Sequence, residues 1–423
     1  MANLPLANIL RHKLRSVLSA LGIGIGICML VTLSGLARGS LYEVADRWEA
    51  VDAELIVYPR IWGDNVTTLS GVGLPDRRIT QLPRTHDAQV AAATCAFLWR
   101  MELAGQDQLA VGVDSDPTAW KRLTGGREPA RGRWCEGEVA ADGRTASQWL
   151  VDTLLSEAPS ASGADELSDW PTTRRVLSAQ AIHDELRRRG GFELVIDARL
   201  AEAGGYRVGQ IVEAANHRWQ IVGIVPAGGL ARVFMPRRVA QFVFGSGDIR
   251  KSTVGFIKLR DGVDPAETAA LLTDATRQAV QVRQYRQMLE QKFGVMFRYV
   301  DMVNSLALLI AFLFIMVTLY TMVLQRTRDI AILKACGATS GFILRQVMGE
   351  ACLLTMAGLV AGVGLSFLAA WAIGTLHPLL TVTITWSWLA VAAGVAGLGA
   401  VTSAMYPAWR ATRVDVAAAL TLE

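Results

Sequence analysis

Charged residues are scarce in this chain of 423 amino acids. Asp, Glu, Lys and Arg make up only 19% of it, whereas 52% of its residues are hydrophobic, which is too apolar for an ordinary soluble protein of this length. No charged residue occurs between Ala351 and Trp409. The Lys and Arg residues are scattered rather than gathered with aromatic residues on one segment, which argues against a nucleic-acid partner. The composition predicts a membrane protein.

Motifs of catalysis and metal binding are missing as well. The sequence has no G-x-S-x-G nucleophile motif and no G-x-x-x-x-G-K-[ST] phosphate loop, and the nearest segment to the latter, GIGIGIC at 22–28, has no Lys. The five histidines are dispersed without the spacing of metal ligands: His12, His86, His183, His217 and His377. We therefore expect no catalytic residue, and no metal or cofactor bound by this chain.

Long apolar stretches are what the sequence does contain. Four of them reach the roughly 20 residues that a helix needs to cross about 30 Å of hydrocarbon: 17–38, 302–325, 351–375 and 384–405. Pro378, which cannot continue a helix, separates the last two. A cleavable signal peptide is the alternative for the first, because RHKLR precedes its apolar core. We expect four transmembrane helices.

Glycines recur one helical turn apart within two of these stretches. Gly22 and Gly26 have this spacing in the first stretch, and Gly358 and Gly362 have it in the third. Because a glycine lets the backbones of two helices approach closely, the spacing is typical of packing faces between membrane helices. We therefore predict that these glycines pack helices rather than bind a ligand.

Positive charges near the ends of the stretches indicate the orientation. They precede the first span, lie between the second and third, and follow the fourth: Arg11, Lys13, Arg15, Arg326, Arg328, Lys334, Arg345, Arg410 and Arg413. Since such charges favour the cytoplasmic side, the lead-in 1–16, the hairpin 326–350 and the tail 406–423 are predicted to be cytoplasmic, with both termini inside. The segment 39–275 then lies outside.

This external segment has the pattern of a mixed α and β domain. ELIVYP, FELVID and RWQIVGIVP have the β-branched character of strands. Asp264 precedes Pro265 and stands three residues before Glu267, which predicts the start of a helix. The composition changes near 136–190, and we interpret this part as an insertion. The external cysteines, Cys95 and Cys135, either form a disulfide in an oxidising compartment or are two free thiols.

A polar segment connects this domain to the second span. Residues 276–301 contain no Pro and continue directly into the apolar stretch, which predicts one helix that protrudes as a stalk. At about 1.5 Å per residue, such a helix extends roughly 35–40 Å outward. The alternative is two helices broken near Gly294.

The segment RTRDIAILKACGAT, at 326–339, predicts a short amphipathic helix and a stop. Ile330 and Leu333 share one face of this helix, while Arg328 and Lys334 reach outward. Gly337 is the predicted C-terminal stop, and Thr339 or Ser340 caps the following helix.

These motifs, in this order, resemble the permease subunits of MacB/FtsX-type ABC transporters, that is, the FtsX-like permease family with a MacB-like periplasmic core domain. RTRDIAILKACGAT resembles a conserved segment of that family, with Asp329 where Glu is usual. YPAWRATRVDVAAAL resembles its C-terminal ending, with Val416 where Pro is common. NILRHKLRSVLSALGIGIG resembles its lead-in, and ELVIDARLAEAGGYRVGQ resembles its periplasmic core. The insertion lies outside the resemblance.

The resemblance implies an α-helical membrane protein with four transmembrane helices and a large mixed α/β extracytoplasmic domain between helices 1 and 2. It implies a separate ABC ATPase that binds ATP and Mg, a second permease copy or paralogue, a periplasmic adaptor protein and contact with membrane lipid. The hairpin is then a coupling helix that docks in the ATPase. The residues assigned to this role are Arg326, Arg328, Asp329, Ile330, Leu333, Lys334 and Gly337. Without the resemblance, the favoured interpretation is an interfacial helix that merely satisfies the positive-inside rule.

The function implied is that of a multi-pass inner-membrane permease. ATP hydrolysis on the partner would move the external domain by mechanotransmission, for export or extraction of a lipid, lipoprotein, peptide or small toxic compound. An FtsX-like regulator of an extracytoplasmic cell-wall hydrolase is the alternative within the family. A membrane sensor is the alternative from another class.

Overall fold

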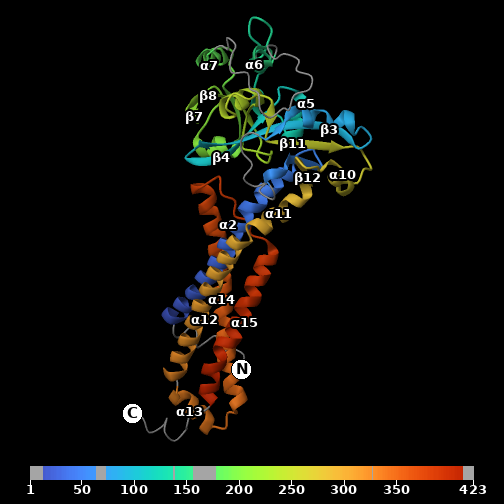
Figure 1. Cartoon of the computed structure of the whole chain (residues 1–423). Helices are drawn as coiled ribbons and strands as arrows, with labels where there is room; N and C mark the ends of the chain where they lie inside the picture. The colour runs from blue at the N-terminus through green and yellow to red at the C-terminus, as the bar shows by residue number, and fades with distance from the viewer. Residues whose placement is uncertain (1–12, 63–72, 137–138, 156–177, 326, 413–423) are drawn as a thin grey trace. The chain divides into compact units, whose positions relative to one another are not determined.

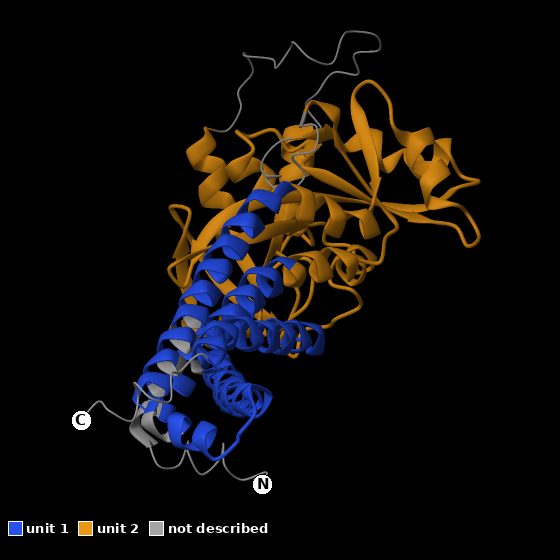
Figure 2. Cartoon of the chain, turned by 90° about the horizontal axis from the view of Figure 1, so that it is seen from below, with its two compact units in different colours: residues 1–41, 292–423 blue, residues 42–291 orange. Residues whose placement is uncertain are grey.

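The computed structural model describes residues 13–62, 73–136, 139–155, 178–325 and 327–412. Two compact units make up the chain (Figure 2). Unit 1 comprises 1–41 and 292–423, and unit 2 comprises 42–291. The first long helix, α2 (Lys13–Glu49), contributes residues to both units.

Unit 1 is helical in its described part (Figure 1). Besides α2 it contains α12 (Gly294–Gln325), α13 (Thr327–Ala335), α14 (Ser340–Leu376) and α15 (Trp386–Thr412). Its core is built from aliphatic side chains of α2 and small ones of α15, with Leu354 of α14 between them. Ala396 and Ala404 supply the small surface that brings α15 close. A bundle of apolar helices follows from the long apolar stretches of the sequence.

Three helices of the described residues are long and apolar enough to cross a membrane: Ser16–Glu49, Ser340–Leu376 and Trp386–Arg410. The number rises to 4 if the pair Val282–Lys292 and Gly294–Ile310, separated by a break, is counted as one span. The second predicted stretch, 302–325, falls within α12. A count of four spans remains a prediction.

Unit 2 is a mixed α/β domain, as predicted. Its main sheet has 10 strands in the order β12-β1-β11-β3-β4-β9-β6-β8-β5, with β7 paired to β8. β4 pairs with β9, and β6 with β8, in parallel, and the remaining neighbours are antiparallel. The strands are β1 (Leu55–Pro59), β3 (Val90–Leu103), β4 (Gln106–Val113), β5 (Arg131–Gly132), β6 (Glu193–Asp197), β7 (Ile211–Ala214), β8 (His217–Val225), β9 (Val233–Pro236), β11 (Val254–Leu259) and β12 (Arg277–Gln281).

Shorter elements complete unit 2. A two-stranded sheet pairs β2 (Leu74–Pro75) with β10 (Lys251–Ser252). The helices are α3 (Asp76–Thr80), α4 (Leu82–Thr85), α5 (Pro117–Leu123), α6 (Ala146–Leu155), α7 (Ala179–Arg188), α8 (Ala198–Gly204), α9 (Arg237–Phe244), α10 (Pro265–Leu272) and α11 (Tyr285–Lys292), with 3₁₀ turns at Arg60–Trp62 and Val282–Gln284. The predicted start of α10 is confirmed, because the Asp264 side chain accepts from the amides of Ala266 and Glu267.

Within the predicted insertion, helices α6 and α7 lie on either side of residues 156–177, which are outside the described part. Helix α7 is amphipathic. Its apolar face buries Ile182 and Leu186.

The prediction of one stalk helix over 276–301 is wrong. Residues Arg277–Gln281 form strand β12, which pairs with β1 in antiparallel register from Leu55↔Gln281 to Pro59↔Arg277. Pairing along a neighbouring strand overrides the local helical preference here, and Ala279 of β12 is buried in the core. Helices α11 and α12 are separate elements on either side of Phe293, which confirms the alternative of a break near Gly294.

Of the two alternatives for Cys95 and Cys135, the structure has two free thiols, and both are buried. Cys95 lies on β3 in the apolar core. The thiol of Cys135 instead donates to the Glu193 carbonyl, at 3.6 Å. Burial raises the pKa of Cys95 to about 12 and that of Cys135 well above its usual value, so both thiols are protonated and unreactive at neutral pH.

Candidate functional site

The hairpin between α12 and α14 has the turn geometry that its sequence predicts. Gly337 has a φ of 92°, which favours glycine. The Gly337 N–H donates to the Lys334 carbonyl at 3.0 Å, and the Ala338 N–H to the Leu333 carbonyl at 2.9 Å, the paired bonds of a Schellman motif. Thr339, rather than Ser340, caps α14, because its side chain accepts from the Phe342 amide. The predicted stop and cap are confirmed.

The side chain of Ile330 packs the hairpin against the helices of the bundle. It is only 8% exposed and packs with Val323 of α12, Ile343 and Val347 of α14, and Ala408 of α15. The expectation that Ile330 fills a groove on a partner is therefore wrong, because its surface is already used inside the chain. Leu333 is half-buried.

A different apolar residue of α13 faces solvent. Ile332 is 46% exposed. Sequence reasoning missed it because apolar residues occupy several faces of this short helix, so periodicity does not tell which face meets the bundle. At the start of α14, Phe342 and Leu344 are also exposed.

Of the charged residues assigned to the hairpin, Lys334 is placed clearly. Its ammonium donates to the carbonyl of Thr412 at the end of α15, at 2.7 Å. It therefore ties α13 to the bundle instead of reaching outward as predicted. Arg326 lies outside the described residues, as do the side chains of Arg328 and Asp329.

Glycines bring α2 and α14 into backbone contact. A Cβ added at Gly358 would lie 2.7 Å from the Ile23 Cβ, and one at Gly362 would lie 2.7 Å from the Gly24 carbonyl oxygen. The predicted packing role of Gly358 and Gly362 is therefore confirmed. Their glycine partner on α2 is Gly24, which the prediction did not name.

Gly22 and Gly26, the two predicted packing residues of α2, are partly removed from solvent. Gly26 is buried and Gly22 is half-buried. Sequence spacing alone could not choose among the three alternating glycines of this segment, because the choice depends on the rotation of α2 against α14.

Polar contacts tie the ends of α2, α12 and α15 in unit 1. The Asn304 amide of α12 donates to the Ser34 hydroxyl of α2 at 2.8 Å, and both side chains are buried. The Arg38 guanidinium lies 3.7 Å from the Asp301 carboxylate and 4.6 Å from the centre of the Trp388 ring. A hydrogen bond inside an apolar bundle has no water to compete with it, so these contacts fix the register of α2 against α12.

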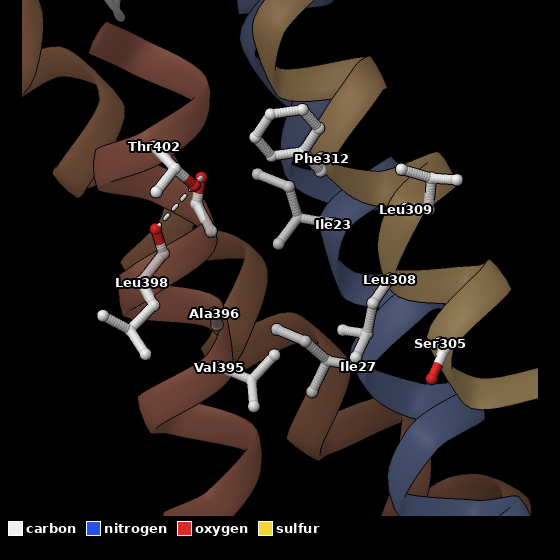
Figure 3. Close-up of a pocket in the computed structure, with 11 residues that line it drawn as sticks. Ile23, Ile27, Ser305, Leu308, Leu309, Phe312, Val395, Ala396, Leu398 and Thr402 are labelled. Atoms are coloured by element: carbon white, nitrogen blue, oxygen red, sulfur yellow. Dashed lines mark hydrogen bonds between the residues drawn. The ribbon is translucent and has the colours of Figure 1, made fainter. Parts of the chain in front are cut away.

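An apolar pocket of about 380 Å³ lies between α2, α12 and α15 (Figure 3). Ile23 and Ile27 of α2 line it together with Phe312 of α12. Its two hydroxyls are used within their own helices, since Thr402 donates to the Leu398 carbonyl at 2.9 Å and Ser305 to the Asp301 carbonyl at 2.8 Å. The pocket therefore suits aliphatic groups.

Within unit 2, the last turns of α2 are held by a network of ion pairs that we call the α2 anchor: Glu43, Arg47, Asp197, Arg199 and Arg232. Arg47 donates to Glu43 at 2.8 Å and to Asp197 at 3.2 Å. Asp197 also accepts from the Leu200 amide and so caps α8. Sequence reasoning missed this network because Arg47 and Asp197 are 150 residues apart.

Helix α11 is joined to the same turns of α2. Arg286 donates to Asp46 at 2.5 Å and lies 3.3 Å from Glu49. Beside these ion pairs, Trp48 stacks on Tyr285 with ring centres 4.4 Å apart. The chain segments that enter and leave unit 2 are thus bound to each other within it.

A bundle of apolar helices with a short, well-capped hairpin, and a large mixed α/β domain between its first two long helices, is the arrangement of a multi-pass membrane protein with one large inserted domain. Family models identify which membrane proteins these are. Residues 16–275 match the MacB-like periplasmic core domain, and residues 302–416 match the FtsX-like permease C-terminal. The chain therefore belongs to the FtsX-like ABC transporter permeases with a MacB-like periplasmic core domain.

Curated relatives carry related names. The chain is 24% identical, over its whole length and 60% of the relative's, to "Macrolide export ATP-binding/permease protein MacB 2" of Aeromonas hydrophila. It is 24% identical, over 97% of this chain and 58% of the relative, to "Pyoverdine export ATP-binding/permease protein PvdT" of Pseudomonas entomophila. To "Uncharacterized ABC transporter permease YknZ" of Bacillus subtilis it is 27% identical over 51% of this chain and 55% of the relative. The chain thus spans under two thirds of each relative's length.

Proposed function

We propose that this chain is the permease subunit of an ABC transporter, which couples ATP hydrolysis on a separate ATPase to movement of its periplasmic domain. The movement would drive export or extraction of a lipid, lipoprotein, peptide or small toxic compound. Family membership supports the permease role, and the export names of the MacB and PvdT relatives favour export over regulation of a hydrolase. ATP and Mg would bind to the ATPase, since the 423 residues contain no phosphate loop.

The observation that carries the proposal is the packing of Ile330. Through this one side chain α13 contacts α12, α14 and α15 in a single apolar cluster. Because a close-packed cluster is not continuously deformable, a force applied to α13 displaces the three helices together. A helix that merely rested at the membrane surface would not need to be embedded in this way.

The α2 anchor is the second part of the proposed path by which a displacement of the helices reaches the periplasmic domain. Helix α2 is continuous from Lys13 to Glu49, and its last turns are held by ion pairs of Arg47 with Asp197 and of Glu43 with Arg232. Removing one partner of a buried pair is costly, so the anchor transmits displacement of α2 to the sheet at β6 without slipping. The ion pairs of Arg286 in α11 with Asp46 and Glu49 attach the chain segment that leaves unit 2 to the same turns of α2.

The docking surface for the ATPase is then the exposed side of the hairpin. We assign its apolar centre to Ile332, because Ile330 is buried. Apolar anchors of this kind dominate interface energies, while charges around them set orientation and rate. Arg326, Arg328 and Asp329 retain the proposed role of orienting charges, whereas Lys334 and Gly337 shape the hairpin.

The proposal includes an orientation and an assembly. Both termini and the hairpin face the cytoplasm in an inner membrane, and unit 2 faces the periplasm. Two permeases, identical or paralogous, pair around two ATPases. A periplasmic adaptor protein joins unit 2, and lipid surrounds the apolar faces of α2, α12, α14 and α15.

The test is purification of the chain with the ATPase encoded beside it, followed by an ATPase assay in lipid. We expect co-purification and ATP hydrolysis that rises in the presence of the permease. An Ile332→Asp variant should insert normally and lose the partner, because a charge replaces the apolar centre of the dock. The matched control is Leu271→Asp, an equally apolar and 53% exposed position in unit 2.

Binding that survives Ile332→Asp would contradict the docking surface, and the failure of any ATPase to co-purify would contradict the proposed function itself. Ile330→Asp has a different expected outcome. Since it places a charge in the cluster that holds α13, it should lower the stability of unit 1 as well as partner binding.

A further inference from the structure

Two histidine rings stack on each other in unit 2. His183 of α7 and His217 of β8 have ring centres 5.2 Å apart and planes inclined by 25°. Phe192 stacks on both, at 6.0 Å from His183 and 5.4 Å from His217. The three rings join α7 to the first residue of β8, and we call His183, Phe192 and His217 the ring seat of α7.

The ring seat is built for uncharged rings. Both histidines are half-buried, and Phe192 is 7% exposed. The Nδ1 of His217 lies 2.8 Å from the Ala215 carbonyl, so this nitrogen carries the hydrogen and the ring is oriented. Phe242 packs against His183 at 5.3 Å and offers no charge to stabilise a cation.

The charged groups around His183 disfavour its protonation. Burial lowers the pKa of His183, and His217 and Arg187 lower it further, while Asp184 raises it. On the other side of the stack, Glu102, Glu213 and Arg218 line the same pocket as His217. A proton on His183 therefore enters a half-buried ring stack in which Asp184 is the group that favours it.

We propose that the ring seat is an acid-sensitive contact, so that acidification outside the membrane loosens α7 from β8. Since burial favours the neutral form of His183, the contact is intact above the usual imidazole pKa and weakens as the pH falls below about 6.5. Ile182 and Leu186 keep their burial in the core, so α7 remains helical and attached. Acidification changes how often the contact between α7 and β8 opens.

The functional consequence concerns the predicted insertion. Arg189, at the end of α7, pairs with Asp142 at 2.8 Å and lies 5.2 Å from the centre of the Trp149 ring of α6. A loosened α7 therefore also loosens its link to α6. Helices α6 and α7 would then respond to the pH outside the membrane while the sheet stays unchanged.

Hydrogen exchange of the purified full-length chain, followed by mass spectrometry between pH 7.5 and pH 5.0, tests this proposal. We expect peptides of α7 (179–188) to lose protection by about tenfold as the pH falls, after correction for intrinsic exchange. Strand β6 (193–197) should stay protected and serves as the internal reference.

The matched variants are His183→Phe and His217→Phe, which keep an aromatic ring in the stack. His183→Phe should protect α7 as the wild type does at pH 7.5 and should no longer lose protection at pH 5.0, because it removes the group whose pKa burial lowers. His217→Phe should still lose protection, but less than the wild type, because burial of His183 remains while the effect of His217 is removed. The same pH course in the wild type and in both variants would overturn the proposal, and so would a wild type without any pH dependence. If one variant fails to fold, the other still decides.

Discussion

Replacing Gly362 by Ala should separate α2 from α14 and destabilise unit 1. The new Cβ would lie 2.7 Å from the Gly24 carbonyl oxygen and 2.8 Å from the Ile27 Cβ, whereas ordinary contact begins at 3.4 Å. Neither atom can rotate away, because one belongs to the backbone and the other is attached to it. The helices must therefore move apart by a large fraction of an ångström, and such overpacking costs about 1–3 kcal/mol.

The matched control is Gly364→Ala, two residues further along the same helix. A Cβ at Gly364 meets nothing within 4 Å. Both substitutions bring the same gain in helix propensity, at most about 1 kcal/mol, so the difference between the two variants isolates the contact. We expect Gly362→Ala to be less stable than Gly364→Ala by about 1–3 kcal/mol, and Gly364→Ala to be at least as stable as the wild type.

Unfolding of the purified chain by increasing SDS in mixed micelles, followed by loss of helical circular dichroism, measures this difference. Gly358→Ala should behave like Gly362→Ala, because its Cβ would lie 2.7 Å from the Ile23 Cβ. Equal unfolding midpoints for Gly362→Ala and Gly364→Ala would refute the close backbone contact between α2 and α14.

Three further predictions concern other contacts. Asp197→Asn keeps an oxygen to cap α8 but removes a charge from the α2 anchor, so the free energy of unfolding of unit 2 in urea should fall by about 3 kcal/mol. The control Glu128→Gln, at an exposed ion pair, should change this free energy by less than about 1 kcal/mol. Thr339→Ala should cost about 1 kcal/mol in the SDS assay through loss of the α14 cap, and no change would contradict the capping bond. Cys95 and Cys135 should resist alkylation at pH 8 until the chain is denatured, and equal mobility on reducing and non-reducing gels should confirm that they are not bonded.

Local signals in the sequence predicted local structure well. Gly337 and Thr339 end one helix and start the next as their residue types indicate, and Asp264 caps α10. These features depend on a few neighbouring residues, so the sequence contains all the necessary information. The apolar helices and the mixed α/β domain could be predicted for the same reason, since composition and periodicity are properties of the chain itself.

The failures all involve partners that are distant in sequence. Residues 277–281 lack strong strand character and form β12 only because β1 lies beside them. Ile330 and Ile332 have the same chemistry, and only the position of the bundle decides that the first is buried. The α2 anchor could not be found from spacing either, because its acids and arginines come from three separate segments.

The bond between Asn304 and Ser34 bears on how the protein is made. The two residues are 270 positions apart, and all of unit 2 is synthesised between them. Before Asn304 is present, the Ser34 hydroxyl has to form its hydrogen bond within its own helix, α2. Asn304 is synthesised 270 positions after its partner, so the bond that joins α12 to α2 can form only when the whole of unit 2 has already been made.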